Sequence, residues 1–305
     1  MLPESRFLSI TSDGKGVSQA ITTVILVMAV MSVSLAAFFF TQLNLTMQSE
    51  QAEFENAKEA MVNLARIIEN LEEGDAQYLT LSINNGGLEL TRGLENIRIT
   101  IWSEDDLSKP PVSLNLGKVN LIKIRGGAGV SGPSFRVLKG DRSINDKNTL
   151  LNRYIIISPD NPSPMGIVYQ EWDRGAWIII DFGRVRAMPS GTILQTDNGE
   201  KWYRVSTVDI VYFNITFGEI SSSGGTYNFH VRIKDVKRYD PEKFHSSTVN
   251  IHVERWSEDG LIHYENRWEY EWRPSDSDTS SSDNRWNLYW TLVYLTVVNV
   301  EVSVR

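Results

Sequence analysis

The feature that most constrains this chain is a long uncharged stretch near its start. No charged residue occurs between Gly16 and Ser49, and within that stretch Ala20–Phe40 comprises 21 residues of which only four are polar. About 20 apolar residues suffice for a helix to cross the hydrocarbon core of a bilayer. In that environment a helix satisfies its backbone polar groups within one segment. The stretch therefore predicts a membrane-spanning helix.

The charges that flank this stretch predict its orientation. Arg6 and Lys15 precede it, whereas acidic residues follow it and the next basic residue is Lys58. Lys and Arg are enriched on the cytoplasmic side of membrane helices. We therefore expect the N-terminus in the cytoplasm and residues from about 46 onward outside the cell.

Three interpretations of the segment are open. A secretory signal peptide would be cut after a small-residue site such as Ser34-Leu35-Ala36. The phenylalanines at 38–40 continue the apolar run past that site, however, and would leave a soluble product with an exposed apolar end. A plain membrane anchor is the second interpretation. The third, which we favour, depends on the residues just before the apolar run.

That junction reads Lys15-Gly16-Val17 and leads into the apolar run through Ser18 and Gln19. It resembles the class III signal peptide of archaeal type IV pilins and archaellins, over residues 15 to about 45. Ile21 stands at the fifth position after the cut, where bacterial pilins have Glu, which fits the archaeal branch better. The resemblance implies that a prepilin-type peptidase removes residues 1–16, and that the helix then packs against sister subunits or other pilins.

A second helical pattern follows without interruption. No Pro or Gly occurs between Val17 and Glu73, so one helix over 17–73 would be ~85 Å long. In its second half, apolar residues recur every three or four positions and predict a packing face; they are Phe54, Ala57, Met61, Leu64, Ile68 and Leu71. The opposite face is expected to be charged, with Glu55, Lys58, Glu59, Arg66, Glu69 and Glu73. Gly74 is expected to end the helix at positive φ.

From residue 74 to residue 305 the pattern is that of β-structure. Apolar and polar residues alternate around Ile99, Val231 and Ile251, and clusters of Gly, Pro, Asn and Ser separate the runs. This pattern predicts an all-β, sandwich-like region outside the membrane. A division into two sandwiches near residues 187–191 is an open alternative. Apart from Thr296, apolar residues at even positions from Leu288 to Val304 predict one buried face of a terminal strand pair or of a long bent strand with a break or bulge.

The composition and the motifs exclude most kinds of catalytic site. The chain has no Cys and a net charge of −8, which argues against thiolate chemistry and against nucleic-acid binding. Gly127–Gly132 matches the dinucleotide-binding pattern, but a strand-like run follows where a helix is needed, so we expect a turn. We predict no catalytic residue, no cofactor and no enzyme activity.

Histidines and aspartates offer only weak metal-site patterns. If 226–238 and 246–256 form a hairpin, His230 and His252 share its polar face, but surface histidines are the better interpretation. His245 and His263 complete the set of four. Calcium binding by Asp276, Asp278 and Asp283 is an alternative to a solvated loop, although their spacing does not match an EF-hand. We predict no metal site.

The aromatic residues give the clearest candidate for ligand binding. Four of them fall on one face of a predicted strand: Tyr264, Trp268, Tyr270 and Trp272. Core packing is the first interpretation, and a stacking surface for a glycan or a neighbouring subunit is the second. Asn44 and Asn214 begin glycosylation sequons, which are usable only outside the cell.

These observations predict a structural role at the cell surface. The leading hypothesis is an archaeal pilin-like protein, either a structural subunit or a minor component of a filament. The alternative is a membrane-tethered extracellular binding protein that never polymerises, for example one that binds carbohydrate. A surface-anchored hydrolase is a third hypothesis, without a recognisable site to support it.

Overall fold

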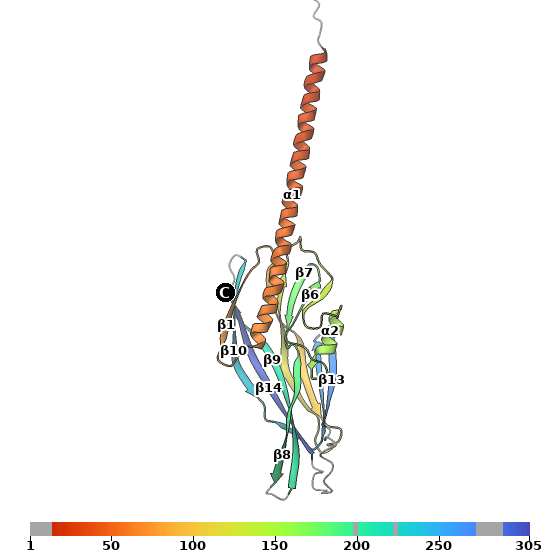
Figure 1. Cartoon of the computed structure of the whole chain (residues 1–305), viewed down its shortest axis with the longest axis vertical. Helices are drawn as coiled ribbons and strands as arrows, with labels where there is room; N and C mark the ends of the chain where they lie inside the picture. Colours follow the sequence, from red (N-terminus) through yellow and green to blue (C-terminus); the bar gives the residue numbers. More distant parts are fainter. Residues whose placement is uncertain (1–13, 198–200, 222–224, 273–288) are drawn as a thin grey trace, which may run out of the picture. The chain divides into compact units, whose positions relative to one another are not determined.

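The structure, a computed structural model, describes residues 14–197, 201–221, 225–272 and 289–305. The chain divides into two compact units, Met1–Ser49 and Glu50–Arg305 (Figure 1). Helix α1 (Gly14–Glu69) contributes its apolar half to the first unit and its amphipathic half to the second. The predicted fold class, a long N-terminal helix followed by an all-β region, is confirmed.

Among the described residues, the β-strands of the second unit form two sheets, one of which curls into a half-barrel. The first sheet has the order β1 (Ala76–Ser82), β10 (Thr226–Arg238), β14 (Tyr289–Val304), β9 (Lys201–Ile220), β8 (Val185–Asp197) and β5 (Ile156–Ile157), with β11 (Glu242–Phe244) beside β14. The second has the order β13 (His263–Glu271), β12 (Thr248–Ser257), β2 (Gly87–Trp102), β3 (Val112–Arg125), β7 (Ala176–Asp181), β6 (Ile167–Trp172) and β4 (Phe135–Lys139). Pairing is antiparallel except between β14 and β9 and between β5 and β8.

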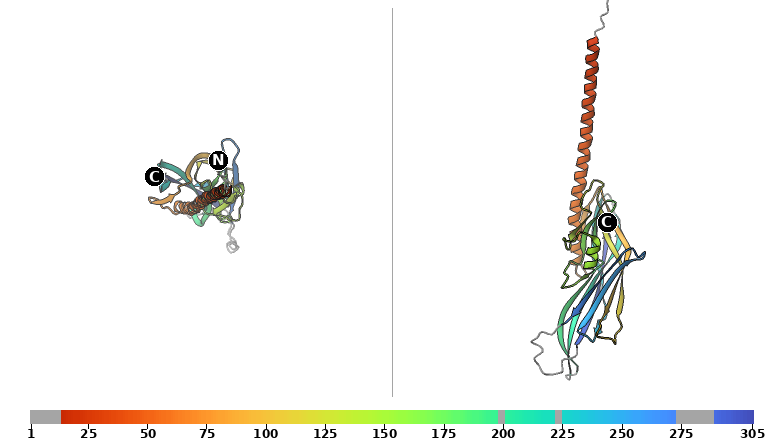
Figure 2. Two further views of the ribbon diagram at one scale, coloured as in Figure 1. Left: turned by 90° about the horizontal axis from the view of Figure 1, so that it is seen from above. Right: turned by 90° about the vertical axis from the view of Figure 1, so that its right-hand side faces the viewer.

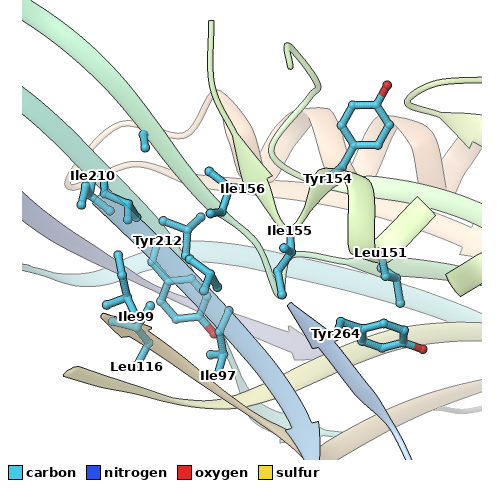
Figure 3. Close-up of a cluster of buried hydrophobic side chains, with 14 of the residues drawn as sticks. Ile97, Ile99, Leu116, Leu151, Tyr154, Ile155, Ile156, Ile210, Tyr212 and Tyr264 are labelled. Carbon is cyan, nitrogen blue, oxygen red and sulfur yellow. The ribbon is translucent and has the colours of Figure 1, made fainter. Parts of the chain in front are cut away.

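One hydrophobic core fills the space between the two sheets. Alternating residues of β2 and β12 point into it, as the period-two pattern predicts: Ile97, Ile99, Ile101, Val249, Ile251 and Val253 are all buried. Helix α2 (Lys147–Tyr154) adds Leu151 and Tyr154 to the same cluster, and Figure 3 shows them with Tyr212 and Tyr264. Asp146 caps this helix by accepting a hydrogen bond from the Thr149 backbone N–H at 2.7 Å.

A second core lies between the amphipathic half of α1 and strands of both sheets (Figure 1, Figure 2). The predicted packing face of the helix is confirmed, because its residues have between 0 and 7 % of their surface exposed: Phe54, Ala57, Met61, Leu64, Ile68 and Leu71. They contact residues such as Ile124 of β3, Ile178 of β7 and Val300 of β14. The amphipathic half of α1 is thus a core element of the second unit.

Two predictions about this half of the helix are wrong in detail. The helix ends at Glu69 rather than near residue 73, because a turn in which Asp75 N–H donates to the Glu72 carbonyl follows, with Gly74 at a φ of +96°. Lys58 and Glu69 are not on a solvent face. Lys58 is 9 % exposed beside the Phe54 ring, and Glu69 forms a salt bridge with Lys139 of β4 at 2.6 Å.

The burial pattern of the last strand differs from the predicted one. In β14 the buried face changes halfway: Val293, Leu295 and Val297 are buried in the first half, and Val298, Val300, Val302 and Val304 in the second. The odd positions belong to the core between the sheets, whereas the even positions pack in the core around α1. Because the two halves of this strand bury opposite faces against different cores, strict alternation predicts only its second half. A β-bulge between Val302 and Val304 fulfils the expected irregularity.

The structure also shows where the possible domain division and the glycine-rich turn lie. Residues 187–191 lie inside β8, where a bulge between Pro189 and Gly191 interrupts the pairing with β9, and residues 50–305 form one unit. The glycine-rich segment 127–132 is a turn, with Val130 N–H donating to the Gly127 carbonyl, and β4 follows it instead of a helix. The aspartates at 276, 278 and 283 lie outside the described residues.

Candidate functional site

The apolar half of α1 is the most conspicuous functional surface. Every large apolar side chain from Ile21 to Met47 is at least 44 % exposed. Exposing a continuous apolar surface of this size to water is unfavourable unless a partner covers it. In the described part of the chain, this is the one helix long and apolar enough to cross a membrane. By length and composition, the segment could serve as a membrane anchor or as a signal sequence.

The processing junction lies at the start of this helix. The backbone of Lys15, Gly16 and Val17 is helical in α1, and residues 1–13 lie outside the described part. Cleavage after Gly16 stays a prediction. Asn44, the first sequon, is exposed on the same helix.

The predicted helix-packing residues act within the chain. Phe54, Met61, Leu64, Ile68 and Leu71 are buried against β-strands of the second unit. They are therefore unavailable to a sister helix while this unit is folded. The exposed segment from Ile21 to Met47 is the part of α1 that remains for contacts with lipid or another chain.

The four predicted aromatic residues do not form one open surface. Tyr264 is 5 % exposed and belongs to the core between the sheets. Trp268 and Tyr270 are half-buried against that core, with ring centroids 5.9 Å apart, and the Trp268 indole N–H donates to Asp160 at 3.2 Å. Trp272 lies beyond β13 and contacts the rings of Tyr289 and the guanidinium of Arg204. Core packing accounts for most of this pattern.

The second sequon is engaged in the sheet. Asn214 lies within β9, and its side-chain amide donates a hydrogen bond of 2.7 Å to Asn299 on the paired strand β14. Attaching a glycan to that nitrogen would break this bond inside a paired sheet. The structure thus favours Asn44 over Asn214 as an acceptor.

The histidines do not come together as a pair. His230 and His252 are on strands of different sheets, so the hairpin between 226–238 and 246–256 that would have placed them on one face does not form. His252 lies near Glu254 and Glu265, with its Nε2 3.5 Å from the Glu265 carboxylate. Glu254 is already bound by Arg98 at 2.5 Å, which neutralises the charge that a metal ion would need. This cluster is best described as a set of surface ion pairs.

A buried ion cluster joins the middle of the second sheet. Arg255 of β12 is 1 % exposed and forms salt bridges with Glu95 and, at 2.8 Å, with Asp181. Burial alone lowers the pKa of Arg255, but the two carboxylates outweigh it, so its pKa lies above the ordinary value. Burial raises the pKa of nearby Tyr264 to about 12. With Arg255, Glu95 and Asp181 all buried, the cluster links β12 to its neighbour β2 and, across the curled sheet, to β7, and is not an open site.

Two surface cavities were not predicted from the sequence. The first, of about 650 Å³, is lined by Trp172, Arg125 and Arg174 together with three glycine-containing loops. Trp172 is 48 % exposed, and Arg174 occupies a three-residue turn between β6 and β7 at a φ of +52°. Trp172 and Arg174 come from the end of β6 and the turn after it, whereas Arg125 comes from the distant strand β3, so no local motif marks the cavity.

The second cavity is a groove of about 710 Å³ between α1 and β4. Helix residues 55–66 form one wall, and Arg136, Leu138, Lys139, Gly140 and Arg142 form the other. The sequence contains a signal for it, since three basic residues occur within 136–142, but their approach to α1 depends on the tertiary fold.

Comparison with protein-family models, with curated proteins and with solved structures yields no match for this chain. The functional argument therefore rests on the geometry of the chain itself.

Proposed function

We propose that this chain is an archaeal pilin-like protein of the cell surface, acting as a structural subunit or minor component of a filament. The observation that carries the proposal is the division of α1 between two uses. Its amphipathic half packs into the core of the folded β-rich unit, whereas every large apolar side chain from Ile21 to Met47 is exposed. A segment of this kind suits lipid before assembly and sister helices after it.

The composition of the exposed segment supports close helix packing. Ala29, Ser32 and Ala36 are spaced by three and four residues, so they share one face of α1. Small residues let two helix backbones approach closely where no water is available to drive association. Assembly also requires removal of the leader, because Arg6 and Lys15 would otherwise carry charge into an apolar bundle. A prepilin-type peptidase is therefore a necessary partner.

The test is the mature N-terminus of the native protein, measured by mass spectrometry, followed by electron microscopy of sheared surface material. We expect a chain that begins at Val17 and is present in filaments. An intact leader would support a permanent tether, and a start near Ala37 would support ordinary secretion. Either result would contradict the filament proposal.

A tethered extracellular binding protein is the second candidate, favoured by the cavity around Trp172. An exposed indole beside two guanidinium groups suits the apolar face and the oxygen atoms of a carbohydrate. Under this proposal Trp172→Ala abolishes binding in a glycan array, whereas the same change at the half-buried Trp268 lowers stability instead. Retention of all glycan binding in the Trp172 variant would exclude this cavity as the glycan site.

A further inference from the structure

The groove between α1 and β4 carries an unusual local charge. Its lining includes five cations and two carboxylates on a chain whose net charge is −8. Lys58 is paired with Glu55 and Lys139 with Glu69, each at 2.6 Å. The three remaining cations are the exposed arginines Arg66, Arg136 and Arg142.

The described residues of the chain do not neutralise these arginines. Arg66 donates to the amide oxygen of Asn63 at 3.3 Å, and Arg142 donates to the Leu138 carbonyl at 3.4 Å. Among the described residues, no carboxylate lies within salt-bridge distance of any of the three. A guanidinium group offers a planar fork of donors that matches a carboxylate, so the groove is built to receive acidic groups.

A surface of opposite charge follows α1 directly in the sequence. Glu72, Glu73 and Asp75 are all exposed in the turn that follows α1. Glu73 lies 3.9 Å from Arg238, with both side chains mostly exposed, so this pair neutralises little. Acidic residues after a helix C-terminus are also unfavourable, because the helix dipole is negative there. Local stability therefore does not explain why three carboxylates stand in this turn.

We propose that the groove containing Arg66, Arg136 and Arg142 binds the acidic turn Glu72–Asp75 of a second copy of this chain. The inference rests on the proposed filament function and names the contact that sets the stagger between subunits. The turn lies roughly ten residues beyond the groove, or ~15 Å along a helix. A second copy shifted by about that distance would bring its turn into the groove of the first.

The contact is heterologous, because the groove and the turn are different surfaces of one chain. Heterologous contacts that do not close into a ring repeat without end and produce filaments. Each subunit in such a filament uses its groove for one neighbour and its acidic turn for another. The contact also depends on salt, because charges at an exposed interface are screened within about 8 Å at physiological ionic strength.

The experiment is a charge exchange in the full chain, with filament yield measured in material sheared from expressing cells. One variant carries Arg66→Glu and Arg136→Glu, a second carries Glu72→Lys and Glu73→Lys, and a third carries all four changes. Like charges across the contact should lower the yield of each of the first two variants at least about tenfold, and the third should restore it. Arg92→Glu with Lys234→Glu, two exposed cations outside the groove, is the matched control and should leave the yield unchanged.

Melting temperatures of all variants show whether the second unit remains folded. If the first two variants melt like the wild type and still form filaments at full yield, the groove contact is wrong while the filament function stands. If the wild type itself forms no filament, both proposals are overturned. Loss of yield in the two reversed variants without recovery in the combined variant overturns the pairing of groove and turn.

Discussion

The two halves of α1 have the same backbone and opposite relations to their surroundings. From Ile21 to Met47 the helix is apolar on all sides and exposed, whereas from Phe54 to Ile68 only one face is apolar and that face is buried. A one-sided apolar pattern therefore marks the part of the helix that packs on its own fold, and an apolar surface on all sides marks the part that needs an external partner. The change occurs at Glu50, whose carboxylate accepts a 2.5 Å hydrogen bond from the Gly129 backbone N–H.

The largest expected difference in stability is between two Leu→Ala variants, one in each half of α1. Leu64 has no exposed surface, so Leu64→Ala should lower the free energy of unfolding by about 2–5 kcal/mol through the cavity it leaves. Leu35 is 57 % exposed, and Leu35→Ala should leave the unfolding of the second unit unchanged. Denaturation of the full chain in detergent micelles can be followed by fluorescence, because all nine tryptophans lie beyond residue 100. Equal effects at the two positions would remove the distinction between the halves.

A smaller effect is expected from the charged contact that holds α1 on β4. The Glu69 carboxylate binds Lys139 and also accepts a hydrogen bond of 2.6 Å from the Gly166 backbone N–H. Glu69→Ala should therefore cost about 1–3 kcal/mol, because it leaves the Gly166 amide without a partner and the largely buried Lys139 with the Gly166 carbonyl but no carboxylate. Glu59→Ala, on the exposed side of the same helix, is the control and should change stability by less than about 0.5 kcal/mol. Similar losses in both variants would show that general helix propensity, and not this contact, is being measured.

The smallest effect concerns a contact in which α1 takes no part. Hydrogen bonds from Ser143 and then from the Tyr154 hydroxyl lower the pKa of Asp141 to about 2. An unfolded Asp titrates near 3.9, so this carboxylate stabilises the fold above about pH 4, and the contribution is lost as the pH falls towards 2. Asp141→Asn should flatten the pH dependence of stability in that window, and Ser143→Ala should do so in part. An unchanged slope in Asp141→Asn would show that other carboxylates account for the acid response.

Local patterns predicted the elements, and tertiary arrangement decided the rest. The spacing of Phe54, Met61 and Leu64 predicts that they share one face of a helix. The alternation around Ile99 and Ile251 predicts strands with one buried face. No hairpin joins His230 and His252, because β10 and β12 lie in different sheets although they are close in sequence. β14 failed in its first half because period two cannot show that the two faces of one strand meet different cores.

The candidate sites were harder to predict than the fold. Lys58 is charged, yet its long apolar stem allows it to lie at 9 % exposure beside Phe54, which no simple division into polar and apolar residues anticipates. Arg66 and Arg136 meet in one groove although 70 positions separate them, and Trp172 joins Arg125 across two strands. Such sites combine residues that are far apart in the sequence, and a single sequence does not show which distant residues lie close together in the fold.

The position of β14 has a consequence for the order in which this protein can be made. It lies between β10 and β9 and pairs in parallel with β9 over nearly its whole length, so it is the shared neighbour of two strands synthesised well before it. Until residues 289–304 have emerged from the ribosome, β9 and β10 lack the strand that joins them, and the core around α1 lacks Val300, Val302 and Val304. Sheet completion is thus a late event that depends on long-range contacts, which are slow to form. The amphipathic face of α1 is therefore synthesised first and stays incompletely covered until the last strand is added.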